Sequence, residues 1–433
     1  MQPLGSTSLW PRLLKSDLRL NCFFSQILTT PIVMSETPFK ISIPDESLAL
    51  LRKKLELTTF PDELPGSGWA YGVPLADVRR LVERWTDGYD WKKHEAQLNS
   101  EIPQFTRDIE VDGHGTLNIH YVHKKSDVAE AIPLLFVHGW PGCFLEARKL
   151  LPLLTKGDDE FPAFHVVALS IPGFGFSQAP ATRGFCLAQY AEVGNKLMLS
   201  LGYDEYVTQG GDWGYPITCA IAQIYGGKHS KAWHTNMTIG EAPPKSDTEP
   251  ALTDKEKAGL ERTSWYQKMG GGYLRQQMTQ PQTLGYSLAD SPAGLLGWIY
   301  EKLVVWADAY AWEDDEVLTW ISIYWFSRGG TDGLLAHILR SRRLHGIFNL
   351  RAASYHPARA VAIPQGHLGA PEEAPSWLQD MGNIVFDAEH ESGGHFAAYE
   401  KPEYLVGDLR KMFGKGGPAF GVVAGKSGYA HVA

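Results

Sequence analysis

The 433-residue chain has few cysteines, no long apolar run and no excess of positive charge. Its four cysteines, Cys22, Cys143, Cys186 and Cys219, form no C-x-x-C pair, so neither a disulfide framework nor a zinc site is indicated. No stretch reaches the roughly 18 consecutive apolar residues of a membrane-spanning helix, and we expect no stable membrane insertion. Forty basic and 49 acidic side chains give a formal net charge of -9, which argues against a nucleic-acid partner. We therefore expect a soluble protein of a reducing compartment, the cytoplasm.

The first residues differ in composition from the rest of the chain. Their three basic side chains are opposed by Asp17 alone, and prolines interrupt the apolar residues. We predict that residues 1–36 form a disordered tail. The alternative is an organelle presequence over residues 1–33, because such segments are rich in arginine and poor in acids.

Two amphipathic helices and a hairpin are predicted in the next part of the chain. A stripe of leucines with helical spacing follows Pro44, and a second helical pattern begins at Pro74. The hairpin turns at the Asp-Gly-His-Gly sequence of residues 112–115. Residues 37–125 are therefore predicted to form a helical lead-in joined to an antiparallel sheet edge.

The middle of the chain has short apolar runs that alternate with helical segments. Such runs are typical of strands buried on both faces of a mostly parallel sheet, so we predict an α/β fold with helices around the sheet. A helical, Trp- and Tyr-rich segment over residues 242–345 is predicted to be an inserted cap. The sheet core then comprises residues 126–241 and 346–433, with a flexible, Gly-rich tail from Lys415. The predicted core strands are residues 132–137, 165–170, 206–209 and 384–386.

The strongest local motif is the sequence Gly-Gly-Asp-Trp-Gly at residues 210–214. It follows a predicted strand and precedes a helical pattern, which is the setting of the G-x-nucleophile-x-G turn, with Asp212 in place of serine. Glycines two residues before and after the nucleophile allow a strained turn that exposes the side chain. Taken alone, the motif also fits an aspartate that caps a helix in a glycine turn.

A second motif favours the role of Asp212 as a nucleophile over a helix-capping role. The sequence His-Gly-Trp-Pro-Gly at residues 138–142 directly follows a predicted strand. An α/β-hydrolase supplies one backbone N–H of its oxyanion hole at this place. We therefore predict that the amides of Trp140 and Trp213 bind one oxygen.

The general base is predicted near the end of the chain. His395 follows the last predicted strand, where a hydrolase presents its histidine. His390 is the alternative, and the glycine pair that precedes His395 favours the latter.

These motifs resemble the microsomal-type epoxide hydrolase family. The sequences H-G-W-P-G, G-G-D-W-G and E-S-G-G-H-F-A-A-Y-E carry the resemblance, with P-Q-T-L-G-Y-S-L-A-D-S-P in the predicted cap. The resemblance covers residues 37–330 and 375–414. It implies an α/β-hydrolase fold with an epoxide-hydrolase-type N-terminal domain, no cofactor and no metal. It also implies a small apolar or aromatic epoxide and water as the partners in the reaction, and a homodimer.

An aspartate nucleophile suits an epoxide because the ring opens at a saturated carbon. Serine would leave an ether that water does not readily cleave, whereas a carboxylate leaves an ester. Water activated by His395 then attacks the carbonyl carbon of Asp212 and releases a vicinal diol. The resemblance further implies two cap tyrosines that protonate the opened oxygen, and Tyr273 matches the first of them.

The family pattern breaks after the cap. The second tyrosine is expected where this chain has His337 and Ile338. The acid that orients the histidine is expected in a turn for which Glu373 is the best match and Glu372 the next.

The break coincides with a stretch of unusual composition. Residues 333–371 contain no Asp or Glu in 39 positions, although the whole chain has 49 acids in 433 residues. Chance gives such a gap about 1% of the time. A reading-frame or splice error, or a genuine frameshift, is our hypothesis for this stretch.

Two other functions stay open beside an epoxide hydrolase. A haloalkane dehalogenase uses the same aspartyl ester, with N–H donors such as Trp140 and Trp213 for the halide and without a cap tyrosine. A degenerate, non-catalytic family member is the other alternative, because residues 333–371 no longer supply the second tyrosine or the partner of the histidine.

Overall fold

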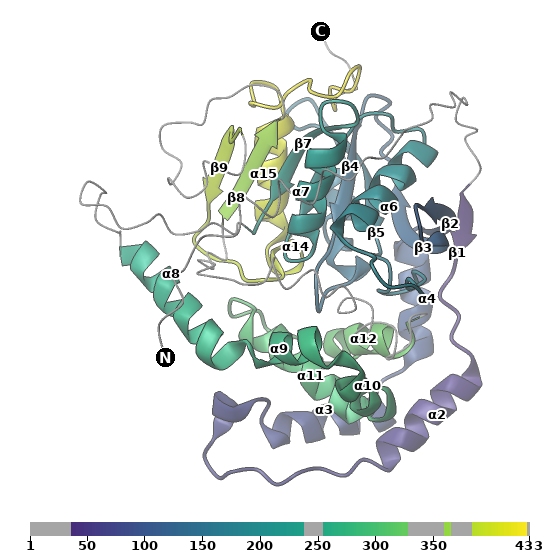
Figure 1. Cartoon of the computed structure of the whole chain (residues 1–433), viewed down its shortest axis with the longest axis vertical. Helices are drawn as coiled ribbons and strands as arrows, with labels where there is room; N and C mark the ends of the chain where they lie inside the picture. The colour runs from purple at the N-terminus through teal and green to yellow at the C-terminus, as the bar shows by residue number, and fades with distance from the viewer. Residues whose placement is uncertain (1–35, 238–253, 328–358, 365–382, 431–433) are drawn as a thin grey trace, which may run out of the picture.

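The computed structural model describes residues 36–237, 254–327, 359–364 and 383–430. The predicted tail and the two positions expected to hold the second tyrosine lie outside these residues. Figure 1 shows the described part as a sheet domain above a layer of cap helices, with the N-terminal helices beneath that layer.

The strands within the described ranges form one sheet, in the order β1-β2-β3-β5-β4-β6-β7-β8-β9. The four central strands, β5, β4, β6 and β7, run parallel to one another, as an α/β fold requires. Antiparallel pairs on both sides of them make the sheet mixed as a whole. The bounds are β1 Thr37–Phe39, β2 Gln104–Val111, β3 Gly115–Lys124, β4 Ile132–Val137, β5 Phe164–Leu169, β6 Tyr206–Gly210, β7 Ser230–Thr235, β8 Arg359–Pro364 and β9 Phe386–Glu389.

Burial explains which strands the sequence reveals. Every residue of β4 is buried, so its uninterrupted apolar run predicts the strand correctly. The strand β7 escapes prediction because buried polar residues, His234 and Thr235 among them, interrupt its apolar pattern.

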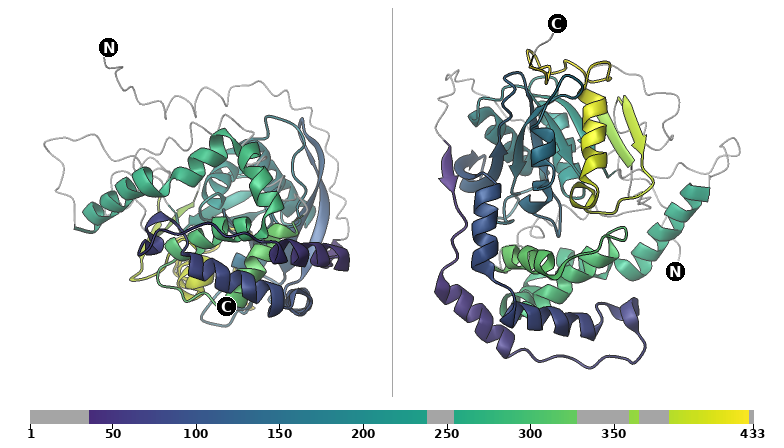
Figure 2. Two further views of the ribbon diagram at one scale, coloured as in Figure 1. Left: turned by 90° about the horizontal axis from the view of Figure 1, so that it is seen from below. Right: turned by 180° about the vertical axis from the view of Figure 1, so that it is seen from behind.

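Helices cover both faces of the sheet and build the cap. The helices α6 and α7 pack together on one face, and α15 lies on the other, as the front and back views show (Figures 1 and 2). The cap helices α11 and α12 contact the N-terminal helices α2, α3 and α4, so the lead-in supports the cap from below. The helix bounds are α2 Asp45–Glu56, α3 Leu75–Asp87, α4 Trp91–Glu101, α5 Leu151–Leu154, α6 Leu187–Ser200, α7 Gly214–Tyr225, α8 Asp254–Trp265, α9 Gly272–Thr279, α10 Pro281–Asp290, α11 Pro292–Val305, α12 Asp314–Trp325, α14 Ala397–Glu400 and α15 Pro402–Phe413, with the short helical turns η1 Gly68–Tyr71, η2 Phe144–Ala147 and η3 Tyr266–Gly270.

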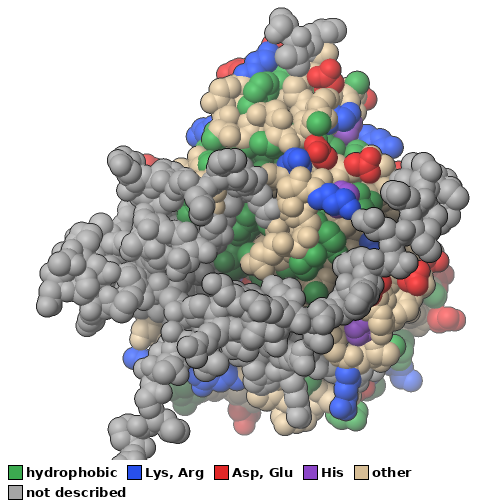
Figure 3. Space-filling view, turned by 45° about the horizontal axis from the view of Figure 1, so that its top comes forward, with side chains coloured by type: hydrophobic (Ala, Val, Ile, Leu, Met, Phe, Trp, Pro, Cys, Tyr) green, Lys and Arg blue, Asp and Glu red, His purple; other side chains and the backbone are tan. Residues whose placement is uncertain are grey.

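Surface charges of both signs are interspersed on the face shown in Figure 3, with no continuous basic stripe in its described part. Within the described ranges, no helix combines the length and apolar character that a bilayer crossing requires. The same ranges contain no group of three or more His, Cys, Asp or Glu side chains arranged to hold a metal ion.

The C-terminal segment is packed, contrary to the prediction of a flexible tail from Lys415. Tyr429 is 2% exposed, and its hydroxyl accepts a hydrogen bond from the amide of Lys415. The backbone of Gly428 accepts from the Ala163 amide and donates to the Glu130 carbonyl. The glycines allow the segment to follow the sheet domain closely, and the apolar side chains between them anchor it.

We expect replacement of Tyr429 by alanine to lower the free energy of unfolding by about 3 kcal/mol, because a buried aromatic side chain is lost. Urea denaturation followed by circular dichroism measures the change. The control is Tyr71→Ala, since Tyr71 is 83% exposed and its loss should cost less than about 0.5 kcal/mol. Equal, small effects of both substitutions would show that the segment is not anchored.

Candidate active site

Two loops meet at the carboxyl ends of neighbouring parallel strands. Val137 at the end of β4 pairs with Gly210 at the end of β6, so the loops that follow these residues lie side by side. A Cβ on Gly214 would lie 2.0 Å from the Val137 carbonyl oxygen, and one on Gly139 would lie 2.4 Å from the Cβ of Asp212. The contact between the two loops therefore requires glycine at both positions.

Asp212 occupies the strained turn that the glycine pattern predicts. Its φ is 49°, a left-handed conformation that a residue with a side chain rarely adopts. The Trp140 amide donates a hydrogen bond of 2.7 Å to its Oδ1 atom. Trp213, the other residue of the predicted oxyanion hole, is buried at the N-terminus of α7, where the helix dipole favours negative charge.

His395 reaches the same carboxylate from the loop between β9 and α14. Its Nε2 atom lies 3.8 Å from Asp212 Oδ2. Burial lowers the pKa of His395, and the Asp212 charge and the Trp140 backbone oppose this shift without cancelling it. A neutral imidazole at physiological pH is what a general base requires.

The alternative histidine is engaged elsewhere. His390 Nε2 lies 2.7 Å from Asp408 Oδ2, and its ring stacks on Tyr404 with the centroids 4.4 Å apart. These contacts engage the His390 ring away from Asp212, which favours His395 as the predicted base.

A buried glutamate that the sequence argument missed fixes the histidine loop. Glu400 accepts hydrogen bonds from the amides of Asp308, Gly394 and Phe396, at 2.8, 3.2 and 2.8 Å. The His395 amide also donates to the Trp306 carbonyl at 2.8 Å. The loop is thus tied to residues 306–308, which connect two cap helices.

Tyr273 forms part of an aromatic layer over the two loops. Its ring stacks on Trp140 at 4.9 Å and meets Trp306 edge-on at 5.2 Å. Its hydroxyl lies 2.8 Å from that of Tyr266, a residue that the sequence argument did not single out. Burial raises the pKa of Tyr266 to about 12 and raises that of Tyr273 well above its ordinary value, so both hydroxyls are protonated at neutral pH.

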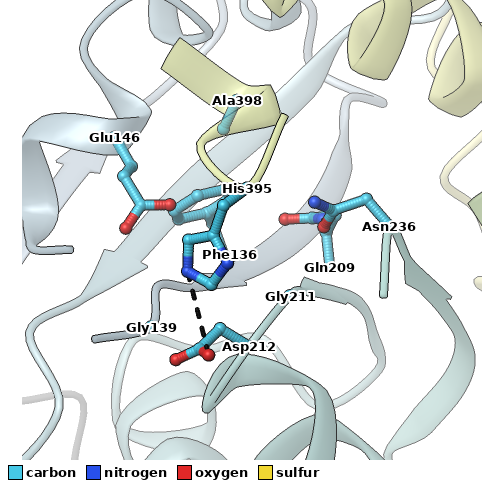
Figure 4. A pocket seen from close by; sticks show the side chains of 9 residues that line it. All are labelled: Phe136, Gly139, Glu146, Gln209, Gly211, Asp212, Asn236, His395 and Ala398. Atoms are coloured by element: carbon cyan, nitrogen blue, oxygen red, sulfur yellow. Dashed lines mark hydrogen bonds and ion pairs between the residues drawn. The ribbon is translucent and has the colours of Figure 1, made fainter. Parts of the chain in front are cut away.

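The core side of the carboxylate borders a small polar cavity (Figure 4). Glu146, from the turn η2, contributes a buried carboxyl group that the sequence argument also missed. Burial and the neighbouring Asp212 charge raise the pKa of Glu146 to about 8. The full lining is Phe136, Gly139, Glu146, Gln209, Gly211, Asp212, Asn236, His395 and Ala398.

The predicted acids Glu373 and Glu372 lie outside the described residues. Neither is therefore placed relative to His395, and the carboxylate partner of the histidine stays a prediction.

These features define a hydrolase with an α/β-hydrolase fold and an aspartate at the nucleophile turn. The family model described as "Epoxide hydrolase N terminus" matches residues 36–147, and the one described as "alpha/beta hydrolase fold" matches residues 132–268. The chain belongs to the epoxide hydrolase family, which confirms both the resemblance and the fold.

Relatives and solved structures carry this membership. A putative epoxide hydrolase of Stigmatella aurantiaca is 38% identical over 392 residues, which cover 87% of this chain and 84% of the relative. Epoxide hydrolase 1 of Sus scrofa is 32% identical, over 87% of this chain and 88% of its own. The Aspergillus niger epoxide hydrolase structure matches with a TM-score of 0.72 and 32% identity, over 88% of this chain and 96% of its own.

His138 supports the loop of Trp140 as a neutral imidazole. Its Nε2 accepts from the Ile171 amide, so its Nδ1 carries the proton and donates to the Gly139 carbonyl. Burial lowers the pKa of His138 from 6.5 to about 4.

Because the folded-state pKa of His138 lies below the unfolded value, its contribution to stability is complete above pH 6.5 and is lost as the pH falls toward 4. We expect about 3 kcal/mol of unfolding free energy to disappear over this window. His138→Gln, which cannot titrate, should show a smaller loss. Chemical denaturation at the two ends of the window measures it, with His114→Gln at the partly exposed hairpin as the control. If the unfolding free energy depends on pH in the same way in the wild-type protein and in both variants, the lowered pKa does not belong to His138.

Proposed function

We propose that this chain hydrolyses epoxides to vicinal diols, with Asp212 as the nucleophile and His395 as the general base. One observation carries the proposal: a single carboxylate accepts the Trp140 amide on Oδ1 and faces His395 Nε2 from Oδ2. A carboxylate held in this way has one oxygen free to attack, and a base is in place to activate water against the ester that results.

The first half-reaction opens the ring. Oδ2 of Asp212 forms a bond to an epoxide carbon while the bond from that carbon to the ring oxygen breaks. The leaving oxygen takes a proton from the hydroxyl pair of Tyr273 and Tyr266. Each hydroxyl has one hydrogen, so two hydroxyls bonded to each other leave one O–H free to donate.

The second half-reaction hydrolyses the alkyl ester. His395 takes a proton from water, whose oxygen attacks Cγ of Asp212. The Trp140 amide, and in our proposal the Trp213 amide, stabilise the negative charge on the carbonyl oxygen. We further propose that Glu373, or otherwise Glu372, orients His395. The substrate is a small apolar or aromatic epoxide, and the protein is a homodimer located in the cytoplasm.

The histidine is required for the second half-reaction only. We expect His395→Gln to accumulate an alkyl-enzyme when it is incubated with styrene oxide, with ester hydrolysis slowed at least about 100-fold. Mass spectrometry of the intact protein and of the Asp212 peptide detects the adduct. Asp212→Asn should form neither adduct nor diol, and His390→Gln should turn over like the wild-type protein. A wild-type protein that forms no adduct and no diol would instead identify a degenerate family member.

The cap tyrosine separates an epoxide hydrolase from a haloalkane dehalogenase. The opened epoxide oxygen needs a proton, so Tyr273→Phe should lower kcat/KM for styrene oxide by about 100-fold. A halide leaves without a proton, so the same substitution should leave any release of bromide from a bromoalkane unchanged. Tyr286→Phe is the matched control, since Tyr286 is 70% exposed on the cap. Release of bromide by the wild-type protein without formation of diol would support the dehalogenase.

A further inference from the structure

The cavity on the core side of Asp212 has the dimensions of a single water molecule. Its interior is about 10 Å³, close to the least space that one buried water needs. The nine residues that line it come from the sheet core and none from the described cap helices. It is therefore separate from the aromatic layer that holds the tyrosine pair.

One polar atom of this cavity has no partner among the described residues. Gln209 is 1% exposed, and its Nε2 donates to Asn236 Oδ1 at 2.9 Å, which leaves its Oε1 unsatisfied. An unpaired buried acceptor costs about 1–3 kcal/mol. Such an atom beside a water-sized space indicates a hydrogen-bond donor that occupies the space.

Glu146 lies across the cavity from these amides, with the His395 ring between them in the view of Figure 4. A Cβ on Gly142 would lie 1.6 Å from Glu146 Oε1, so the last glycine of the His-Gly-Trp-Pro-Gly motif makes room for this carboxyl group. Because the raised pKa of Glu146 is about 8, the group carries a proton at neutral pH and can donate a hydrogen bond.

We propose that this cavity binds the hydrolytic water, with Glu146 as a neutral donor to the water oxygen and Gln209 as the acceptor of one water hydrogen. Asn236 orients the Gln209 amide, and His395 accepts the other water hydrogen. The inference rests on the proposed function and adds to it the residues that place the water.

The position of the cavity on the core side of Asp212 suits a water that reacts only after the ester has formed. After the first half-reaction the alkyl group of the ester occupies the cap side of Asp212, so water has to approach the ester carbon from another side. A water already bound among core residues does not compete with the substrate for space. A neutral Glu146 also avoids the repulsion that a second carboxylate would exert on Asp212 before the reaction.

Glu146 neither gives nor takes a proton during hydrolysis of the ester. The water oxygen bonds to Cγ of Asp212 while one water proton passes to His395. The tetrahedral intermediate then collapses, the bond from Cγ to the diol oxygen breaks, and that oxygen takes the proton from His395. Asp212 is left as a carboxylic acid, which ionises, and the proton that it releases restores, through solvent, the tyrosine hydroxyl that was deprotonated in the first half-reaction.

The test separates the two half-reactions in Glu146→Leu, Glu146→Gln and Gln209→Leu. Single-turnover reactions with styrene oxide, stopped by acid and analysed by mass spectrometry, give the rates of ester formation and of ester hydrolysis. Glu192→Leu is the control, because Glu192 is also a buried glutamate but lies in α6 outside the cavity.

We expect Glu146→Leu and Gln209→Leu to slow ester hydrolysis about 10- to 100-fold and to leave ester formation unchanged, so that the alkyl-enzyme accumulates. Glu146→Gln keeps an N–H donor of the same size and should hydrolyse the ester within about threefold of the wild-type rate. Glu192→Leu should not change the ratio of the two rates.

Three results would overturn the water site while leaving the proposed function intact. The first is unchanged hydrolysis in both leucine variants. The second is an equal loss in both half-reactions, which would mark a structural role. The third is a Glu146→Gln variant as slow as Glu146→Leu, which would require an ionised carboxylate. A wild-type protein that forms no ester would overturn the proposed function and the water site together.

Discussion

The hydrogen bond from the Trp140 amide to Asp212 is the contact on which the site depends. It joins the loops that follow two neighbouring parallel strands, and it forms only because Gly139 and Gly214 let the backbones approach. A side chain at either position would separate the amide from the carboxylate. The left-handed conformation of Asp212 has the same origin, since the tight turn after β6 has to direct the carboxylate toward the neighbouring loop.

The cap helps to hold the loops of Trp140 and His395 in place. In α12, the Trp320 indole donates to the Pro141 carbonyl, and the Tyr324 hydroxyl donates to the Gly142 carbonyl at 2.7 Å. The segment that precedes α12 accepts the amide of His395 through the Trp306 carbonyl. The loop of Trp140 and the loop of His395 are thus attached to the same part of the cap, so a displacement of the cap would move both loops relative to Asp212.

Local sequence predicts the parts of the site that backbone geometry determines. The turn at Asp212 and the loop at Trp140 depend on glycines at fixed spacing, which a sequence shows directly. Glu146 and Tyr266 escape prediction because their roles arise from burial and from neighbours distant in the sequence. The same reason explains the packed C-terminal segment, where long-range hydrogen bonds outweigh the flexibility that its glycines suggest.

In the mechanism that we propose, the two half-reactions use two sides of the Asp212 carboxylate. The cap side presents hydroxyl groups that stay protonated because burial raises their pKa, as the proposed ring opening requires. The core side presents a neutral imidazole and a protonated Glu146, because burial disfavours the charged form of both groups. Burial thus surrounds Asp212 with neutral groups, and among the described residues no lysine or arginine forms an ion pair with it.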